Sequence, residues 1–204
     1  MKPYPAIATL EFRQITVGIQ IADAMVKQAP VSLLKSGVIS QGRYLALLAG
    51  STAAVEESYR EGCYRAGGDL LDHAWLPDVA PTLYQALLGA TEPCHSHVAV
   101  GILETDTVSA MLQAAERALK GTPVVLSEMR LADPWLHGKG IAIFNGELHD
   151  VEAALDLAAA FLATQPHGFN RRILTAPSEG ILAQLNQHAP FHAAAPVNLN
   201  GELP

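Results

Sequence analysis

The chain has 204 residues, of which 50% are hydrophobic and 16% charged, which is enough apolar material for a sizeable core and too much for a disordered chain. Its formal net charge of −7 argues against nucleic acid and anionic membrane surfaces as partners, because both bind Lys/Arg-rich faces. No run reaches the roughly 18–20 uncharged apolar residues of a membrane span, and two cysteines are too few for a disulfide framework, so we expect a soluble, cytosolic protein.

The first half of the chain begins with an apolar stretch, A-I-A-T-L-E at residues 6–11, which predicts a strand. A helix pattern follows, with apolar residues spaced 4, 3 and 4 apart at Ile15, Ile19, Ala22 and Val26. Next come a strand ending at Gly50 and a second helix pattern with the same spacing at Val55, Tyr59, Gly62 and Ala66. The stretch at 72–77 closes this half as a short strand that ends in proline.

The second half repeats these patterns. A-V-G-I-L-E from Ala99 places Glu104 on Glu11 at an offset of 93 residues, and the same offset places Lys120 on Lys27. The strand that ends at Gly146 matches the one that ends at Gly50 at an offset of 96, so three residues are inserted between 123 and 138. The sequence therefore encodes one small fold twice.

Each half reads as strand, helix, strand, strand, helix, strand, which predicts an α+β protein of two tandem ferredoxin-like (βαββαβ) domains. We place the first domain at 1–90 and the second at 98–186. The linker between them, A-T-E-P-C-H-S-H, has the proline and polar residues of a domain boundary. The tail at 187–204 has three prolines and no period, so we expect it to be irregular.

Several motifs in this order resemble a known family. D-A-M-V-K-Q-A-P-V-S-L-L at 23–34 and its counterpart A-E-R-A-L-K-G-T-P-V-V-L at 115–126 are similar to bacterial microcompartment shell domains. The resemblance covers about residues 6–185 and both halves, so it is to the tandem-domain (BMC-T type) shell proteins, in the unpermuted strand order. It implies a homotrimer that mimics a hexagonal tile and a place beside hexameric tiles and pentameric vertices in the shell of a cytoplasmic organelle. It also implies a pore for small metabolites and no enzymatic activity.

The resemblance also assigns roles to single residues. A lysine at the end of the first helix of each domain makes the family's contact between tiles, which implies Lys27 and Lys120 here. The family often has an arginine after the proline of the last strand, whereas this chain has Asp78 and Ser178. The edge chemistry is therefore altered, and the partners of the two lysines stay open.

The connection between the two middle strands carries the family's pore. The resemblance implies these pore-lining residues: Gly37, Val38, Ile39, Ser40, Gln41, Asp133, Pro134, Trp135, Leu136 and His137. Each occurs three times around a threefold axis, so the three-residue insertion matters there. Trp135 and His137 either pack against the core of the second domain or have a function. Trp135 would then narrow the pore or stack on a planar ligand, and three His137 side chains would form a metal or anion site.

No cofactor is expected. One branch of the family holds an iron–sulfur cluster through a pore-loop cysteine, but this chain has Ser36 and Ser40 there, whose oxygens replace thiolate poorly. Cys94-His95-Ser96-His97 is too tightly spaced for a metal site, so we interpret it as a surface linker, and Cys63 as a small buried hydrophobe.

Two other functions remain open at this point. The first is a ferredoxin-like regulatory trimer that binds a small molecule between its subunits. The second and weaker one is an enzyme that uses His137 and Asp133 at a subunit junction.

Overall fold

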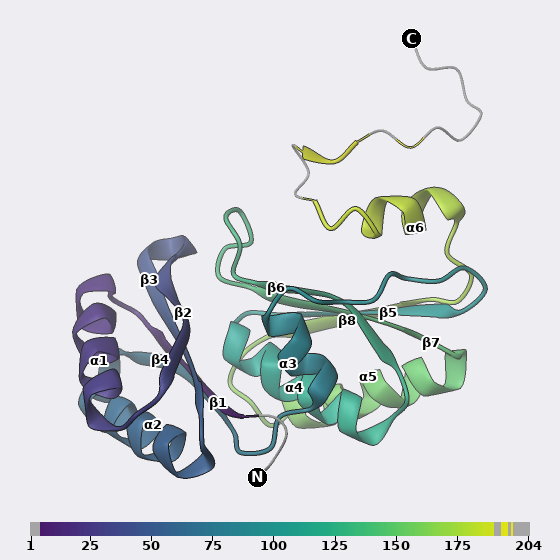
Figure 1. Cartoon of the computed structure of the whole chain (residues 1–204). Helices are drawn as coiled ribbons and strands as arrows, with labels where there is room; N and C mark the ends of the chain where they lie inside the picture. Colours follow the sequence, from purple (N-terminus) through teal and green to yellow (C-terminus); the bar gives the residue numbers. More distant parts are fainter. Residues whose placement is uncertain (1–4, 190–192, 196, 198–204) are drawn as a thin grey trace.

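The computed structural model describes residues 5–189, 193–195 and 197, and each half of it contains a four-stranded antiparallel sheet (Figure 1). The first half comprises β1 (Ala6–Phe12), α1 (Ile15–Gln28), β2 (Ser32–Ile39), β3 (Arg43–Gly50), α2 (Thr52–Ala66) and β4 (Leu70–Leu76). The second half comprises β5 (Ala99–Thr105), α4 (Val108–Gly121), β6 (Val125–Leu131), β7 (Gly140–Gly146), α5 (Leu148–Leu162) and β8 (Phe169–Leu174).

The two sheets have the same strand order, β2-β3-β1-β4 and β6-β7-β5-β8. In each sheet the first strand of the half is one of the two inner strands and carries Leu-Glu just before its last residue, and the two long helices of that half pack on one face. The predicted α+β class and the tandem ferredoxin-like domains are confirmed.

Two short helices were not predicted, namely α3 (Pro81–Leu87) after β4 and α6 (Glu179–Leu185) after β8. Each spans seven residues, too few for a periodic pattern to stand out. Short 3-10 turns also occur at Ser40–Gly42 and Gly67–Asp69. The predicted irregular tail at 187–204 lies mostly outside the described residues.

Helix starts follow the local sequence. The Ser51 hydroxyl accepts a hydrogen bond from the Ala54 amide at the start of α2, and the Thr107 hydroxyl accepts one from the Ala110 amide at the start of α4, both at 3.3 Å. These N-caps satisfy amides that the helix leaves unpaired. They fix the point at which each chain segment turns from a strand into a helix.

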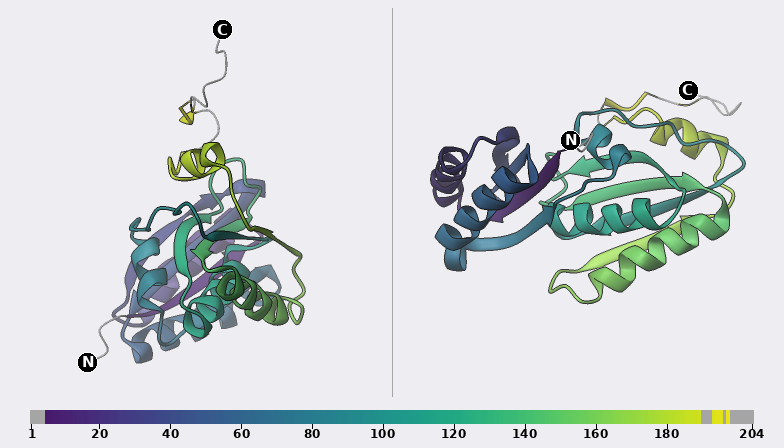
Figure 2. Two further views of the ribbon diagram at one scale, coloured as in Figure 1. Left: turned by 90° about the vertical axis from the view of Figure 1, so that its right-hand side faces the viewer. Right: turned by 60° about the horizontal axis from the view of Figure 1, so that its bottom comes forward.

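The second half covers the open face of the first sheet. Alternate residues of β1 face opposite sides: Leu10 packs with α1 and α2, whereas Ile7 belongs to a core that continues into α4 and α5. Figure 2 shows α4 between the two sheets, and α3 lies beside it against β6. The first sheet is thus covered on both faces, by its own helices and by α4.

Candidate functional site

Both predicted pore loops lie at the same end of the molecule, where the β2–β3 and β6–β7 hairpins end (Figure 1). The tips are close, because a Cβ built on Gly138 would lie 2.9 Å from Nη1 of Arg43. Register places the three-residue insertion in the second tip. Val38 pairs with Tyr44 across five intervening residues in the first hairpin, whereas the equivalent pair in the second hairpin, Leu131 and Gly140, encloses eight. The fold therefore brings the two sets of predicted pore residues together in one chain.

The second tip is held by its own backbone. The Ala132 amide donates to the Lys139 carbonyl, and the Leu136 amide donates to the Asp133 carbonyl, both at 3.0 Å. Trp135 and His137 have positive φ angles of 80° and 52°, which non-glycine residues seldom adopt. The turn fixes both residues in an outward position.

Trp135 is 80% exposed, so the alternative in which it packs in the core of the second half is wrong for this chain. His137, Pro134 and Gln41 are exposed as well, and Val38 in the first hairpin is 61% exposed. An exposed tryptophan offers a large apolar ring and an N–H donor with which a partner or ligand can make contact. The hairpin tips therefore form a surface with free side chains.

The joint between the halves contains a buried acid. Glu11 of β1 is fully buried, and its Oε1 accepts a 2.6 Å hydrogen bond from the Ser109 amide in the first turn of α4. Its Oε2 has no hydrogen-bond partner among the described residues. Burial raises the pKa of Glu11 to about 7, and the nearby negative charge of Asp72 adds to the rise. Sequence analysis explained Glu11 by the repeat alone and gave no sign of this environment.

Further contacts cross the same joint. Thr9 and Ser109 share a 2.8 Å hydrogen bond between their hydroxyls, and the Thr107 hydroxyl donates to the Asp72 carboxylate. At the other end of α4, the Glu116 carboxylate accepts from the Ala80 amide at 2.9 and 3.1 Å. The joint is therefore specific as well as apolar.

The two predicted tile-edge lysines occupy different environments. Lys27 is exposed and forms a 2.5 Å ion pair with Asp23, one turn earlier on α1. Lys120 pairs with Glu116 at 2.6 Å and also donates to the Asp78 carbonyl, so it lies at the joint between the halves. Asp78 is one of the two residues, with Ser178, that stand where the resemblance implied an arginine.

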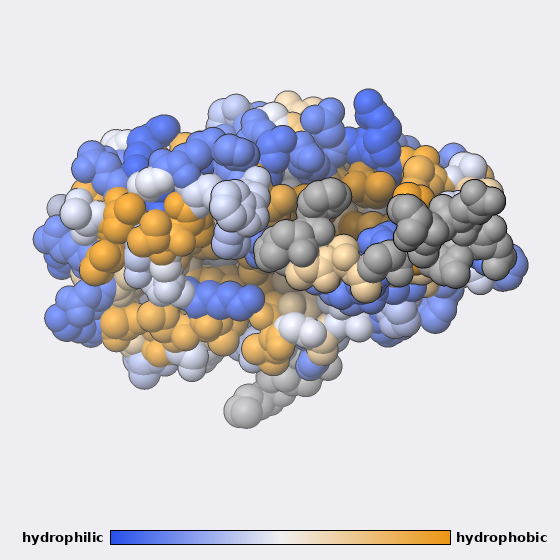
Figure 3. All heavy atoms as spheres, turned by 90° about the horizontal axis from the view of Figure 1, so that it is seen from above, coloured by the Kyte–Doolittle hydropathy of each residue, from blue (hydrophilic) through white to orange (hydrophobic). Residues whose placement is uncertain are grey.

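The open face of the second sheet is covered only in part, by the linker and α6, and α1 has exposed apolar residues. Ile19 of α1 is 52% exposed, whereas its equivalent in α4, Leu112, is fully buried beside the first sheet. Leu112 lies beside Thr9 and Leu45 of the first sheet. The equivalent residues of the second sheet, Ile102 and Ile141, are partly exposed. Figure 3 shows hydrophobic residues at the surface of the first half, where Val26, Leu33 and Val38 are also exposed.

The linker does not lie wholly on the surface as predicted. Cys94 is buried with Val100, Ile143 and Leu182, and the Asn186 side chain holds its backbone with hydrogen bonds of 2.7 and 2.9 Å. Burial raises the pKa of this thiol and that of the half-buried Cys63. Within the described residues no group of three His, Cys, Asp or Glu is placed to hold a metal, and no helix is long and apolar enough to cross a membrane.

The fold and the paired tips are those of a known class. A model of the BMC domain matches the chain twice, over residues 6–79 and 99–171, so the chain belongs to the BMC domain family and carries two such domains in tandem. It is 32% identical over 180 residues to the bacterial microcompartment shell protein PduT of Citrobacter freundii, a match that covers 88% of this chain and 97% of that protein.

Solved structures agree with this assignment. A microcompartment protein from Desulfitobacterium hafniense matches with a TM-score of 0.75 and 29% identity, over 87% of this chain and 98% of that chain. The fused permuted hexameric shell protein of the RMM microcompartment matches with a TM-score of 0.58 over 78% of this chain and 81% of that chain, but at 19% identity this likeness concerns the fold alone. The prediction of a tandem-domain microcompartment shell protein is confirmed.

Proposed function

We propose that the chain is a structural subunit of a bacterial microcompartment shell, within the cytoplasm, and that three copies close into a tile with the hairpin tips around a central pore. One observation carries the proposal: the interface between the two halves of the chain has equivalent surfaces, on the second sheet and on α1, that do not contact each other within the chain. The open face of the first sheet packs on α4. The equivalent face of the second sheet is covered only in part, by the linker and α6, and the equivalent helix α1 does not pack on it.

The residues of the two surfaces correspond one to one. Leu112 borders the same cavity as Thr9, Leu45 and Leu47 of the first sheet. Their equivalents in the second sheet, found by strand register, are Ile102, Ile141 and Ile143. All three are apolar, and so is Ile19, the equivalent of Leu112. Ile102 and Ile141 are partly exposed, whereas Ile143 is already buried beside Cys94 and Leu182 of the same chain. A second copy of the chain therefore offers a suitable cover for this face.

The short helices support the same arrangement. Leu83 of α3 is fully buried in the core at the joint, where α3 contacts α4 and β6. Its equivalent in α6, Ile181, is 49% exposed. In the proposed ring, α1 and β2 of the next chain would cover Ile181 as α4 and β6 cover Leu83.

A contact between two different surfaces repeats head to tail until the ring closes. Two similar domains in each of three chains give six similar wedges, which is the geometry of a pseudo-hexamer. We expect the predicted residues at both tips to line the pore, with Trp135 and His137 repeated three times. Of the predicted pore residues, Gly37 and Ile39 lie in β2 and, with Asp133, also border the cavity between the two halves. We expect the pore to pass small metabolites, and we expect the edge with Lys27 to contact other shell proteins, hexameric tiles and pentameric vertices.

The role proposed is structural, so we expect no turnover from His137 or Asp133. We also infer that no iron–sulfur cluster is held at the pore, because Ser36 and Ser40 stand where cysteine would be needed. The alternative of a small-molecule regulator is not favoured by the matches, which are to shell and microcompartment proteins.

Light scattering on the purified chain tests the ring. We expect a mass three times the 21.6 kDa of one chain. Ile19→Asp and Ile141→Asp should each give the mass of a single chain with an unchanged circular dichroism spectrum, because a charge would face the apolar joint. Tyr64→Asp, at an 85% exposed position on α2, should leave the trimer intact. A wild-type chain that stays monomeric at all concentrations would refute the proposal.

A further inference from the structure

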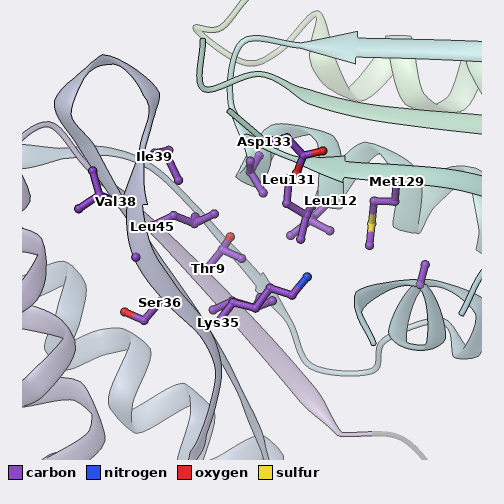
Figure 4. A pocket seen from close by; sticks show the side chains of 14 residues that line it. Thr9, Lys35, Ser36, Val38, Ile39, Leu45, Leu112, Met129, Leu131 and Asp133 are labelled. Atoms are coloured by element: carbon purple, nitrogen blue, oxygen red, sulfur yellow. The ribbon is translucent and has the colours of Figure 1, made fainter. Parts of the chain in front are cut away.

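A cavity of about 290 Å³ lies between the two halves of the chain, and Figure 4 shows its lining. One wall is formed by β2 and β3, and the other by α4 and β6. Most of the lining is apolar, with Leu45 and Leu47 on one side and Leu112, Met129 and Leu131 on the other. Its volume is at the lower end of the range for small-molecule sites, roughly 300–1,000 Å³, which favours a small ligand.

The cavity exists because of a difference between the repeats. Gly37 of β2 pairs with Leu45, and its equivalent Arg130 of β6 pairs with Ile141 in the same register. A long side chain thus occupies this position in the second half and none occupies it in the first. A Cβ built on Gly37 would meet no heavy atom within 4 Å, so the space beside it is open.

The same difference leaves one charge without a partner. In the second half Glu128 is 7% exposed and forms a 2.5 Å ion pair with Arg130. Its equivalent in the first half is Lys35, which pairs with Leu47 as Glu128 pairs with Ile143. Gly37 cannot supply a counter-charge, and no described side chain forms an ion pair with Lys35. Figure 4 shows Lys35 extending from β2 across the cavity, beneath Thr9.

The other polar groups of the lining are already engaged. The Thr9 hydroxyl is bonded to Ser109 at 2.8 Å and the Ser36 hydroxyl to Tyr44 at 2.6 Å. Asp133 lies 3.7 Å from Nη1 of Arg130. Among the described residues that line the cavity, Lys35 is the one cation, it has no ion-pair partner, and it lies beside a largely apolar surface. That combination suits a ligand with one negative charge and a short hydrocarbon body.

We propose that this cavity binds a short-chain carboxylate, with the carboxylate on Nζ of Lys35 and the hydrocarbon chain against Leu45, Leu112 and Met129. Lys35 is exposed, so a ligand reaches it from solvent. Every lining residue belongs to one chain, so the site does not depend on ring closure. If the chain binds the carboxylate but stays monomeric, the proposed trimer is refuted and the proposed carboxylate site is supported.

Calorimetric titration of the full chain with hexanoate tests the site. We expect saturable binding with one site per chain, and binding at least tenfold weaker for Lys35→Gln, because a charge-assisted contact is lost. Lys35→Arg keeps the charge and should keep most of the affinity. Hexan-1-ol, which has the same chain without the charge, should bind at least tenfold more weakly than hexanoate.

A second variant tests the apolar part. Gly37 lies outside the left-handed region and its surroundings are open, so Gly37→Leu should fold normally, fill the cavity and remove hexanoate binding. Lys27→Gln, which changes an exposed lysine elsewhere, should bind as the wild type does. The site is refuted if hexanoate does not bind, if Lys35→Gln or Gly37→Leu binds it unchanged, or if inorganic phosphate binds as tightly as hexanoate.

Discussion

In the first half of the chain Gly18 of α1 lies against Tyr44 of β3, and in the second half Met111 of α4 lies against Gly140 of β7. These are equivalent positions, so the large and the small residue have changed places between helix and strand. The contact keeps one large and one small residue although neither residue is kept. A repeated fold therefore constrains the pair rather than the single residue, in line with the close packing of protein interiors.

A second difference concerns what covers each sheet. The first sheet is buried by its own helices and by α4, and Leu112 is fully buried as a result. The second sheet has only its own helices and α6, and Ile19 stays 52% exposed. One half is completed by the other within the chain. The second half, by contrast, presents a surface that only another molecule can complete.

The largest expected effect tests this second difference. Leu112→Ala should lower the free energy of unfolding by about 3 kcal/mol, because it opens a cavity at a fully buried site. Ile19→Ala at the equivalent position should lower it by less than about 1 kcal/mol within one chain. Urea unfolding at several protein concentrations separates the two: the Ile19→Ala effect should depend on concentration, because it acts on association. Equal effects, both independent of concentration, would contradict the account.

The exchanged pair predicts the next effect. A Cβ on Gly18 would lie 2.5 Å from the Tyr44 Cβ, so Gly18→Ala should lower the free energy of unfolding by roughly 1–3 kcal/mol despite the better helix propensity of alanine. The double variant Gly18→Met with Tyr44→Gly, which copies the second half, should be more stable than Gly18→Met alone. Gly68→Ala serves as the control, because nothing lies within 4 Å of its Cβ position. Strictly additive changes in the double variant would show that the two positions are not coupled.

Glu11 predicts a pH dependence. Its pKa is raised from 4.5 to about 7 in the folded chain, so between these values the folded chain binds more protons than the unfolded one. Stability should therefore fall as pH rises from about 4.5 to 7. Glu11→Gln should remove this slope and be more stable than the wild type at pH 8, by on the order of 1–3 kcal/mol.

The equivalent acid is the control for this prediction. Glu104 is partly exposed and pairs with Lys139 at 2.6 Å, so Glu104→Gln should leave the slope in place. Thermal unfolding followed between pH 4 and pH 8 measures both variants. A wild-type chain whose stability rises through this range would show that Glu11 is not the controlling group.

The smallest effect on folding is expected at the two lysines. Lys27 and Asp23 are mostly exposed, so Lys27→Ala should change the free energy of unfolding by no more than about 0.5 kcal/mol. Lys120 contacts the buried Glu116 and the Asp78 carbonyl, so Lys120→Ala should cost more, about 1 kcal/mol. Chemical denaturation compares them. If Lys27 contacts neighbouring tiles, its removal should also abolish sheets seen by negative-stain electron microscopy.

Much of the fold could be predicted because the repeat doubles the evidence for each element. The spacing of Ile15, Ile19, Ala22 and Val26 predicted a helix, and α1 spans Ile15–Gln28. The short helices α3 and α6 were missed because seven residues do not establish a period. The strand predicted at 72–77 is β4 at Leu70–Leu76, because the proline that marks its end, Pro77, lies just beyond the paired residues.

The site was less predictable, because it depends on contacts between distant segments. The order of the motifs predicted that Gly37–Gln41 and Asp133–His137 lie in equivalent hairpins of the two halves. The structure shows the tips of these hairpins side by side. Nothing local in the sequence separates Glu11 from Glu104 or Leu112 from Ile19, since both members of each pair follow the same pattern. Their different burial comes from the docking of α4 on the first sheet. Aligning Gly37 with Arg130 was the one available signal for the cavity.

A cryo-electron microscopy structure of the purified chain tests the central claim most directly. The account predicts three chains around a threefold axis, with Ile19 of each on Ile102 and Ile141 of the next and with Trp135 from all three near the axis. A monomer would contradict it, and so would a trimer in which the open face of the second sheet points to solvent or the hairpin tips lie on the outer rim.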